Sequence, residues 1–375
     1  MLVTTPRSRA EPARPPHRPK YRRRNCCMAA PLVASMAPEA AEAAKTTEAA
    51  SSAQAASAPE DAATSVTLWW NDDDRELMHG ACDMHVHLEP CMFTRQTSEL
   101  EFARFALKAG YRAAVSKCHH TLNADRIGSV RQQVPGFEMF GAVVLNHFVG
   151  GLNPYAVEAS IGSGGKITWM PTMHAANHVK TFGSPSYARL SRKSDLNAAE
   201  LPSARPPISI FGENGKIRPE VHDILHLVAK SGTILATGHL GYEEMKALIR
   251  AARESGVEKI VVTHAEMEVS NLSVEQQVEL ADMGAYIEHV ILPLLPLYGR
   301  LSPEQYVAAI KAVGPERTIL STDCGQPYNP HPIEGMRQFV RTLLYKGVAK
   351  AHIDLMLKRN PAQLLGLEPQ AARSR

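Results

Sequence analysis

Residues 80–87 read Gly-Ala-Cys-Asp-Met-His-Val-His, a short β-rich run that ends in two alternating histidines. Seven further apolar runs follow along the chain, and helical patterns separate them. Strands that alternate with helices are typical of βαβ units in a parallel sheet. The eight runs are residues 80–87, 111–118, 138–147, 166–173, 232–239, 259–265, 285–292 and 318–323. Because eight strands close a (β/α)₈ barrel, we predict an α/β fold with a single TIM barrel.

Helix signals between these runs support the same fold. A capping residue precedes each of three helical patterns, and a glycine follows each one. The capping residues are Ser98, Gly241 and Ser273, and the glycines are Gly110, Gly256 and Gly284. The connection 174–231, after the fourth run, is much longer than a usual loop and contains a hairpin signal at Glu213-Asn214-Gly215. In a barrel this insertion lies at the catalytic face, where it could act as a lid.

The first 65 residues differ in composition from the rest of the chain. An Arg/Pro-rich piece is followed by an Ala/Ser/Glu stretch with almost no large apolar side chains. Such a segment cannot bury enough surface to offset the entropy of ordering, so we predict a disordered tail over 1–65 and the barrel over 66–370. The basic start leaves mitochondrial targeting open, although five prolines before residue 20 would break the amphipathic helix of such a signal.

Composition narrows the class of protein and its partners. The formal net charge is +3, and much of the excess of Arg and Lys lies before residue 25, which argues against a nucleic-acid footprint on the folded part. The apolar runs are too short to cross a bilayer as helices. Six cysteines form no CxxC pair, so free thiols in a reducing compartment are the simpler interpretation. We expect a cytoplasmic protein that acts on a small molecule, and a homo-oligomer is possible.

The candidate chemistry lies at the ends of the predicted strands. His85 and His87 share one face by alternation and point into the barrel mouth, where two imidazoles can share a metal ion. His239, His264 and Asp323 each follow a later apolar run. In a closed barrel the carboxyl ends of the strands converge on one rim. The sequence therefore predicts a metal centre built from these five side chains.

This arrangement, HxH on strand one, histidines on strands five and six and an aspartate on strand eight, resembles the amidohydrolase superfamily over residues 78–367. The resemblance implies a metal-dependent hydrolase. It implies that His85, His87 and Asp323 bind one divalent ion, and that His239 and His264 bind a second ion or orient substrate. It also implies that Asp323 takes a proton from the attacking water. Segments 116–120, 149–154 and 169–172 are similar to an amidohydrolase-like group without an assigned reaction.

One ligand of many binuclear members is missing from its usual place. They carry a bridging, carbamylated lysine on strand four, where this chain has Met170-Pro171-Thr172-Met173-His174. Lys117 ends the second run, and alternation places it toward the mouth. It could therefore supply the bridge or bind substrate, and a mononuclear site remains open. We accordingly expect Asp323, Lys117 and His264 to be catalytic.

Further residues near the predicted rim are candidates for substrate binding. They are His119, His174 and Glu266, the last placed beside His264 by alternation. Histidine and carboxylate ligands favour zinc, with manganese or iron as alternatives, as one ion or two. The sequence thus predicts hydrolysis of a C–N or C–O bond in an amide, lactone or ester. Decarboxylation, phosphoester cleavage and a ligand-binding barrel without turnover remain alternatives. Retention of all five principal ligands argues against the last.

Overall fold

A computed structural model describes residues 70–187, 192–201 and 203–368, all within one compact unit that spans Pro59–Arg375. The predicted tail over 1–65, and with it any targeting signal, lies outside the described residues. Among the residues described, no helix has both the length and the apolar character that a membrane span needs.

Short parallel strands form the centre of this unit. They are β1 (Cys82–Val86), β2 (Ala113–Ser116), β3 (Glu138–Phe140), β4 (Ala142–Val144), β5 (Ile167–Trp169), β6 (Ile234–Ala236), β7 (Ile260–Val262), β8 (Tyr286–Val290) and β9 (Thr318–Ser321). Only Gly141 separates β3 from β4, so the two occupy a single predicted run. Each of the eight predicted runs therefore contains its strand.

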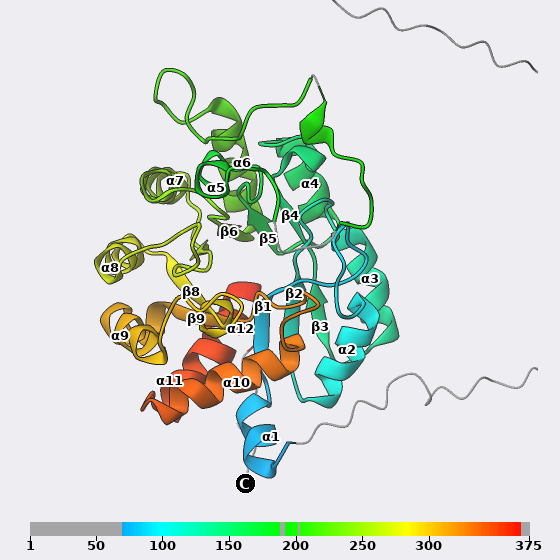
Figure 1. The fold of residues 1–375 in the computed structure, drawn as a ribbon, viewed down its shortest axis with the longest axis vertical. Helices are drawn as coiled ribbons and strands as arrows, with labels where there is room; N and C mark the ends of the chain where they lie inside the picture. Colours follow the sequence, from blue (N-terminus) through cyan, green and yellow to red (C-terminus); the bar gives the residue numbers. More distant parts are fainter. Residues whose placement is uncertain (1–69, 188–191, 202, 369–375) are drawn as a thin grey trace, which may run out of the picture. The chain divides into compact units, whose positions relative to one another are not determined.

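The strands follow chain order and close on themselves. β1 to β3 pair in parallel, as do β4 to β9. The last strand returns beside the first, because the amide of His87 donates to the carbonyl of Cys324 at 2.8 Å and the amide of Asp323 donates to the carbonyl of His85 at 2.8 Å. Figure 1 shows the strands at the centre of a ring of helices. The prediction of a (β/α)₈ barrel is confirmed.

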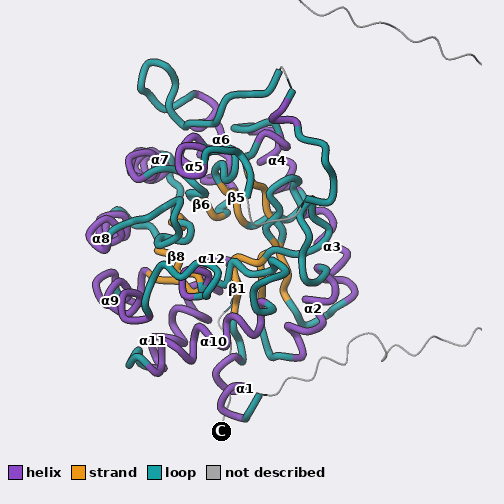
Figure 2. The backbone as a smooth tube through the Cα atoms, viewed as in Figure 1, coloured by secondary structure: helices purple, strands orange, loops and turns teal. Residues whose placement is uncertain are grey.

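Helices surround the strands (Figure 2). They are α1 (Asp72–Met78), α2 (Glu99–Lys108), α3 (Ala124–Gln133), α4 (Pro154–Gly162), α5 (Ala176–Phe182), α6 (Pro219–Ser231), α7 (Tyr242–Glu254), α8 (Val274–Asp282), α9 (Pro303–Val313), α10 (Pro332–Tyr345), α11 (Lys350–Asp354) and α12 (Asn360–Leu365), with short turns η1 (His147–Val149), η2 (Ala198–Glu200), η3 (Leu292–Leu294), η4 (Pro315–Arg317) and η5 (Leu355–Arg359). The expected caps are present: Ser98 and Ser273 form capping boxes with Glu101 and Gln276.

The interior of the barrel is apolar toward the amino ends of its strands. Cys82, Ile167 and Ile319 pack there together with Leu364 and Leu365 of α12. The side chain of Asn360 donates to the carbonyl of Thr318 at 2.7 Å, which ties α12 to the start of β9. This end is thus filled and covered, and polar side chains gather at the other end.

A register shift in β1 aims the two histidines of the HxH motif. Cys82 and Met84 belong to the apolar interior, so simple alternation would turn His85 and His87 away from it. The pairing of β1 with β2 shifts between Asp83 and Val86. Bulges of this kind re-aim side chains near functional sites. After the shift, the two imidazole rings lie 5.3 Å apart, both buried.

The predicted insertion after the fourth run is present between β5 and α6. It contains α5, η2 and a small hairpin in which Phe211 pairs with Ile217. Its Ile208 pairs in parallel with Ala175, which anchors the insertion to the end of β5. The segment from Phe182 to Tyr187 borders the cavity at the carboxyl ends of the strands. The insertion therefore stands where a lid was expected.

Candidate active site

The first and last strands bring three candidate ligands together. Nε2 of His87 lies 2.9 Å from Oδ1 of Asp323, and Nε2 of His85 lies 3.1 Å from the same oxygen. One ligand atom from each of these residues falls within 4.8 Å of the others, and all three residues are buried. We call this set the strand cluster.

Hydrogen bonds orient both imidazoles toward the same point. Nδ1 of His87 lies 2.9 Å from the carbonyl oxygen of Lys117, which can only accept, so Nδ1 donates there and Nε2 is the nitrogen that faces Asp323. Nδ1 of His85 lies 3.1 Å from a carboxylate oxygen of Glu288. Metal-binding histidines are held in this way, by an acceptor on the second ring nitrogen. The donor set and its orientation fit a divalent cation.

A close approach of two backbones places Asp323 beside the histidines. Asp323 has φ of 55°, and Gly325 has φ of 128°. A Cβ on Gly325 would stand 1.8 Å from the carbonyl oxygen of His87, so any larger residue would separate β9 from β1. A non-glycine residue at positive φ costs about 1–3 kcal/mol, and such strain gathers at functional sites.

His239 and His264 complete the predicted set. Their ring centroids lie 5.0 Å apart, and that of His264 lies 5.9 Å from that of His85. His239 shares a hydrogen bond with His178 at 2.8 Å through Nδ1, and Nδ1 of His264 lies 3.3 Å from the Ser270 hydroxyl. Both line the cavity, which has a volume of about 300 Å³. The five predicted ligands therefore meet at one place.

Lys117 enters the same group. Its Nζ lies 2.9 Å from Nε2 of His85, and the side chain is fully buried. Burial lowers the pKa of Lys117 to about 8, although the carboxylates of Asp323 and Glu288 act in the opposite direction. The uncharged amine is thus accessible near neutral pH. An uncharged amine is the form that can bind a metal or become carbamylated.

Negative charge is concentrated around His85. Burial would lower its pKa, but the carboxylates of Asp323 and Glu288 raise it to about 9. Burial would raise the pKa of Asp323, yet His85 and His87 hold it well below its usual range. Burial lowers the pKa of His264 to about 4, which leaves a neutral imidazole at neutral pH. The carboxylates of Asp323 and Glu288 thus concentrate negative charge around His85, and this is the electrostatic setting that a cation needs.

Of the three residues predicted to bind substrate, His119 lines the cavity and the other two do not. His119 lines the cavity, stacks on His87 with ring centroids 4.7 Å apart, and lies 3.0 Å from the Thr172 hydroxyl. The ring of His174 packs instead against those of His147 and Phe148, and His174 is not among the residues that line the cavity.

Glu266 also lies elsewhere. Its carboxylate is 2.7 Å from Nδ1 of His289 rather than beside His264. The alternation argument fails here because β7 ends at Val262, so the chain is already turning at Glu266. His264 itself has φ of 33°, which no extended strand adopts. Strand geometry cannot be extended past the last paired residue.

Two residues of the site were not predicted from the sequence. Glu288 orients His85 and also accepts a hydrogen bond from the amide of His264 at 3.0 Å. Its signal was an acid inside a largely buried strand, Tyr286–Val290. Arg95 lines the cavity from the loop after β1, and nothing near it in the sequence indicates that position.

A second group of donor atoms lies on the loops after β1 and β2. Cys91, Cys118 and His120 bring one donor atom each within 4.8 Å of the others, and we call them the loop cluster. Sγ of Cys91 lies 3.9 Å from Nδ1 of His120, and Nε of Arg95 donates to Sγ of Cys91 at 3.4 Å. Both thiols are free, as expected. Their sequence separation gave no sign that they meet.

The model of a family of unknown function, DUF6282, matches residues 80–288. No curated protein sequence matches the chain. Solved structures similar to it include an amidohydrolase from Pseudomonas aeruginosa (12% identity, 79% of this chain and 98% of that chain, TM-score 0.54) and the probable dipeptidase PvdM from Pseudomonas aeruginosa (12%, 78% and 96%, 0.54). A third is a mutant organophosphorus hydrolase from Deinococcus radiodurans (15%, 78% and 94%, 0.50). At such identities the likeness shows the fold alone, a (β/α)₈ barrel.

Proposed function

Because the chain belongs to DUF6282, a family of unknown function, we propose its activity from the site itself: a metal-dependent hydrolase that cleaves a C–N or C–O bond of a small organic substrate. One observation carries the proposal. Both imidazoles of the HxH motif give Nδ1 to an acceptor and turn Nε2 toward Asp323. The names of the solved structures with this fold, an amidohydrolase, a probable dipeptidase and an organophosphorus hydrolase, support hydrolysis.

The strand cluster would hold one divalent ion. Nitrogen and carboxylate donors suit zinc first, and manganese or iron next. His239, His264 and Lys117 border the same cavity and would hold a second ion or bind substrate. When bound, a divalent ion lowers the pKa of a coordinated water to about 7 and polarises the attacked oxygen.

The side chains supply positioning and proton transfer. Asp323 is kept anionic by His85 and His87, so its carboxylate can accept the proton of the attacking water. His264 has Nδ1 beside the Ser270 hydroxyl, which leaves Nε2 for the oxygen of the scissile group. Lys117 lines the cavity with a lowered pKa of about 8 and can bridge ions or donate to the developing negative charge.

The test is metal content per chain, measured by elemental analysis of the purified protein. Wild type is compared with His85→Ala/His87→Ala and with Asp323→Asn. The matched control is His222→Ala/His226→Ala, which removes two exposed histidines one helical turn apart on α6. We expect one or two ions per chain in wild type and in the control, and loss of ions from the two site variants. A folded wild type that stays metal-free after reconstitution would refute the proposal.

Substrate class follows from a screen of the metal-loaded protein. Esters, lactones and amides are tested first, with phosphate esters and decarboxylation assays in the same panel because the same barrel could support them. Turnover that Asp323→Asn abolishes and His222→Ala/His226→Ala preserves would establish hydrolysis at this site. Turnover of phosphate esters alone would replace the C–N or C–O assignment.

A further inference from the structure

The guanidinium of Arg95 is a buried cation at the edge of the cavity. The residue is 6% exposed and lines the cavity together with His87 and His119. Its Nε donates to Sγ of Cys91. Neither of its two terminal nitrogens has a hydrogen-bond partner among the residues that the structure describes. Guanidinium groups stay protonated in proteins, and a buried charge without a counterion is costly.

The nearest acid on the same loop is already used. The Glu89 carboxylate accepts hydrogen bonds from the backbone amides of Cys91 and Arg95, each at 2.9 Å. It also pairs with Lys193 at 2.5 Å. These contacts shape the loop around Arg95 but do not neutralise its guanidinium. Within the described ranges, 70–187, 192–201 and 203–368, no ion pair involves Arg95.

The loop holds the guanidinium in a fixed place. Besides the two bonds to Glu89, the amide of Gln96 donates to the carbonyl of Gly325 at 3.0 Å, which ties the loop to the end of β9. The guanidinium carbon lies 5.7 Å from the centre of the Phe93 ring. A preorganised donor loses little entropy when it binds a ligand. The cation is thus positioned in advance for an anion that the described part of the chain does not supply.

We propose that Arg95 binds a carboxylate of the substrate, so that the hydrolysed molecule is a small organic acid. That this carboxylate belongs to a substrate rests on the hydrolase function proposed above. The two terminal nitrogens of an arginine form a planar fork that matches the two oxygens of a carboxylate. Arg95 lines the same cavity as His87, Lys117 and His119, which places its guanidinium next to the reacting centre.

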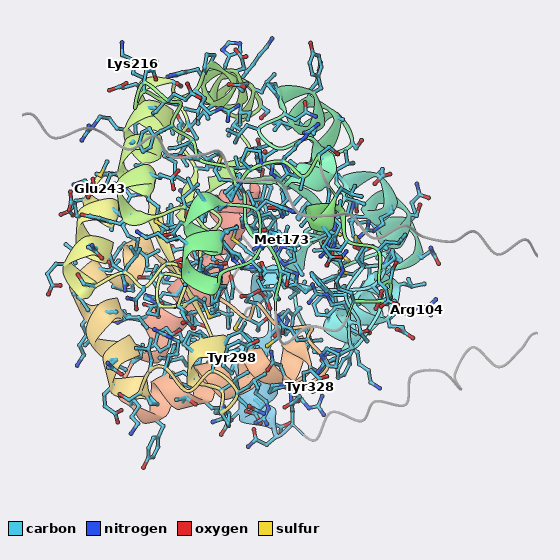
Figure 3. All side chains as sticks on the ribbon, turned by 45° about the horizontal axis from the view of Figure 1, so that its top comes forward. Arg104, Met173, Lys216, Glu243, Tyr298 and Tyr328 are labelled. Carbon is cyan, nitrogen blue, oxygen red and sulfur yellow. The ribbon has the colours of Figure 1, made fainter. Side chains whose placement is uncertain are left out.

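The rest of the cavity agrees with a small acid. A volume of about 300 Å³ is at the lower end for small-molecule sites. Phe182, Met267 and Leu292 give it an apolar wall, and Tyr298 of the same lining is labelled in Figure 3. The other arginine of the lining, Arg300, is paired with Glu268 at 3.2 Å. Arg95 is therefore the arginine of this lining with a free anion-binding fork.

The test is direct binding of benzoate and of benzamide, an uncharged analogue of the same shape, by isothermal titration calorimetry. Wild type is compared with Arg95→Gln and with the matched control Arg300→Gln, which removes the paired arginine of the same cavity. We expect Arg95→Gln to weaken benzoate binding by about tenfold or more, since it removes the charge-assisted hydrogen bonds to the carboxylate. Benzamide binding, and benzoate binding to Arg300→Gln, should change by less than about threefold.

Two further measurements keep the outcome decisive. His85→Ala/His87→Ala should still bind benzoate, because the carboxylate is held by Arg95 and not by a metal. If Arg95→Gln is poorly folded, Arg95→Met serves instead, and benzoate should raise the Tm of wild type but not that of Arg95→Met. Benzoate that binds Arg95→Gln as tightly as wild type, that requires the histidines, or that does not bind wild type at all overturns the inference. Loss of metal or turnover with Arg95-dependent binding intact would refute the hydrolase proposal alone.

Discussion

The strand cluster and the loop cluster each bring three donor atoms within 4.8 Å, yet their surroundings differ. His85 and His87 have acceptors on Nδ1, and an anionic carboxylate completes the set. In the loop cluster, Nε2 of His120 has no partner among the described residues, and Arg95 donates to Cys91. Proximity of donors is thus common to both clusters. Orientation and negative charge therefore support the strand cluster as the proposed metal site.

In the loop cluster, the two thiols hydrogen-bond to each other and to neighbouring side chains. A hydrogen bond from the Cys91 thiol and others from His120 and Thr121 hold the pKa of Cys118 well below its usual range, although burial opposes them. The same hydrogen bond and burial raise the pKa of Cys91. Arg126 adds a further cation beside Cys118. The hydrogen bond between the two thiols and the neighbouring guanidinium of Arg126 leave little negative charge for a metal ion.

The largest effect on the strand cluster should come from Gly325→Ala. The new Cβ would collide with the carbonyl of His87, and the residue has φ of 128°. We expect a loss of about 3 kcal/mol or more in the free energy of unfolding, measured with urea, together with loss of bound metal. The control is Gly347→Ala, also at positive φ but exposed, with no atom within 4 Å, which should cost about 1 kcal/mol. Equal losses would mean that the close approach of β9 to β1 does not hold the cluster together.

A smaller effect is expected from Glu288→Gln. The carboxylate orients His85, and removal of such a partner usually costs about 10–100-fold in metal affinity. Competition with a chelator measures this affinity. The matched control is Glu266→Gln, a buried acid that pairs with His289 instead of a cluster histidine, and it should leave affinity unchanged. If Glu266→Gln weakens metal binding as much as Glu288→Gln, the orienting role of Glu288 fails.

The sequence predicted what depends on a single run of residues. Each barrel strand is buried on both faces, so it appears as an apolar run, and a polar residue such as His239 or Asp323 at its end lies on the rim. Roles that depend on contacts between different strands, or on the conformation of a loop, were not predictable. Glu288 orients His85, which lies on another strand. The position of Arg95 depends on the hydrogen bond from its amide to the Glu89 carboxylate, which shapes the loop. Glu266 was misplaced because alternation was extended beyond the end of β7.

The smallest effect should come from Cys91→Ser/Cys118→Ser. If the loop cluster holds no ion, the metal content per chain stays at the wild-type value, because the strand cluster is intact. Serine keeps a hydroxyl that can accept from Arg95, so the loop should retain its shape. Loading the wild type and the variant with cobalt adds a spectroscopic check, since a thiolate ligand would give a charge-transfer absorption that the variant lacks. Loss of one ion per chain, or of such an absorption, would show that proximity of donors suffices here. The distinction drawn from orientation and charge would then be wrong.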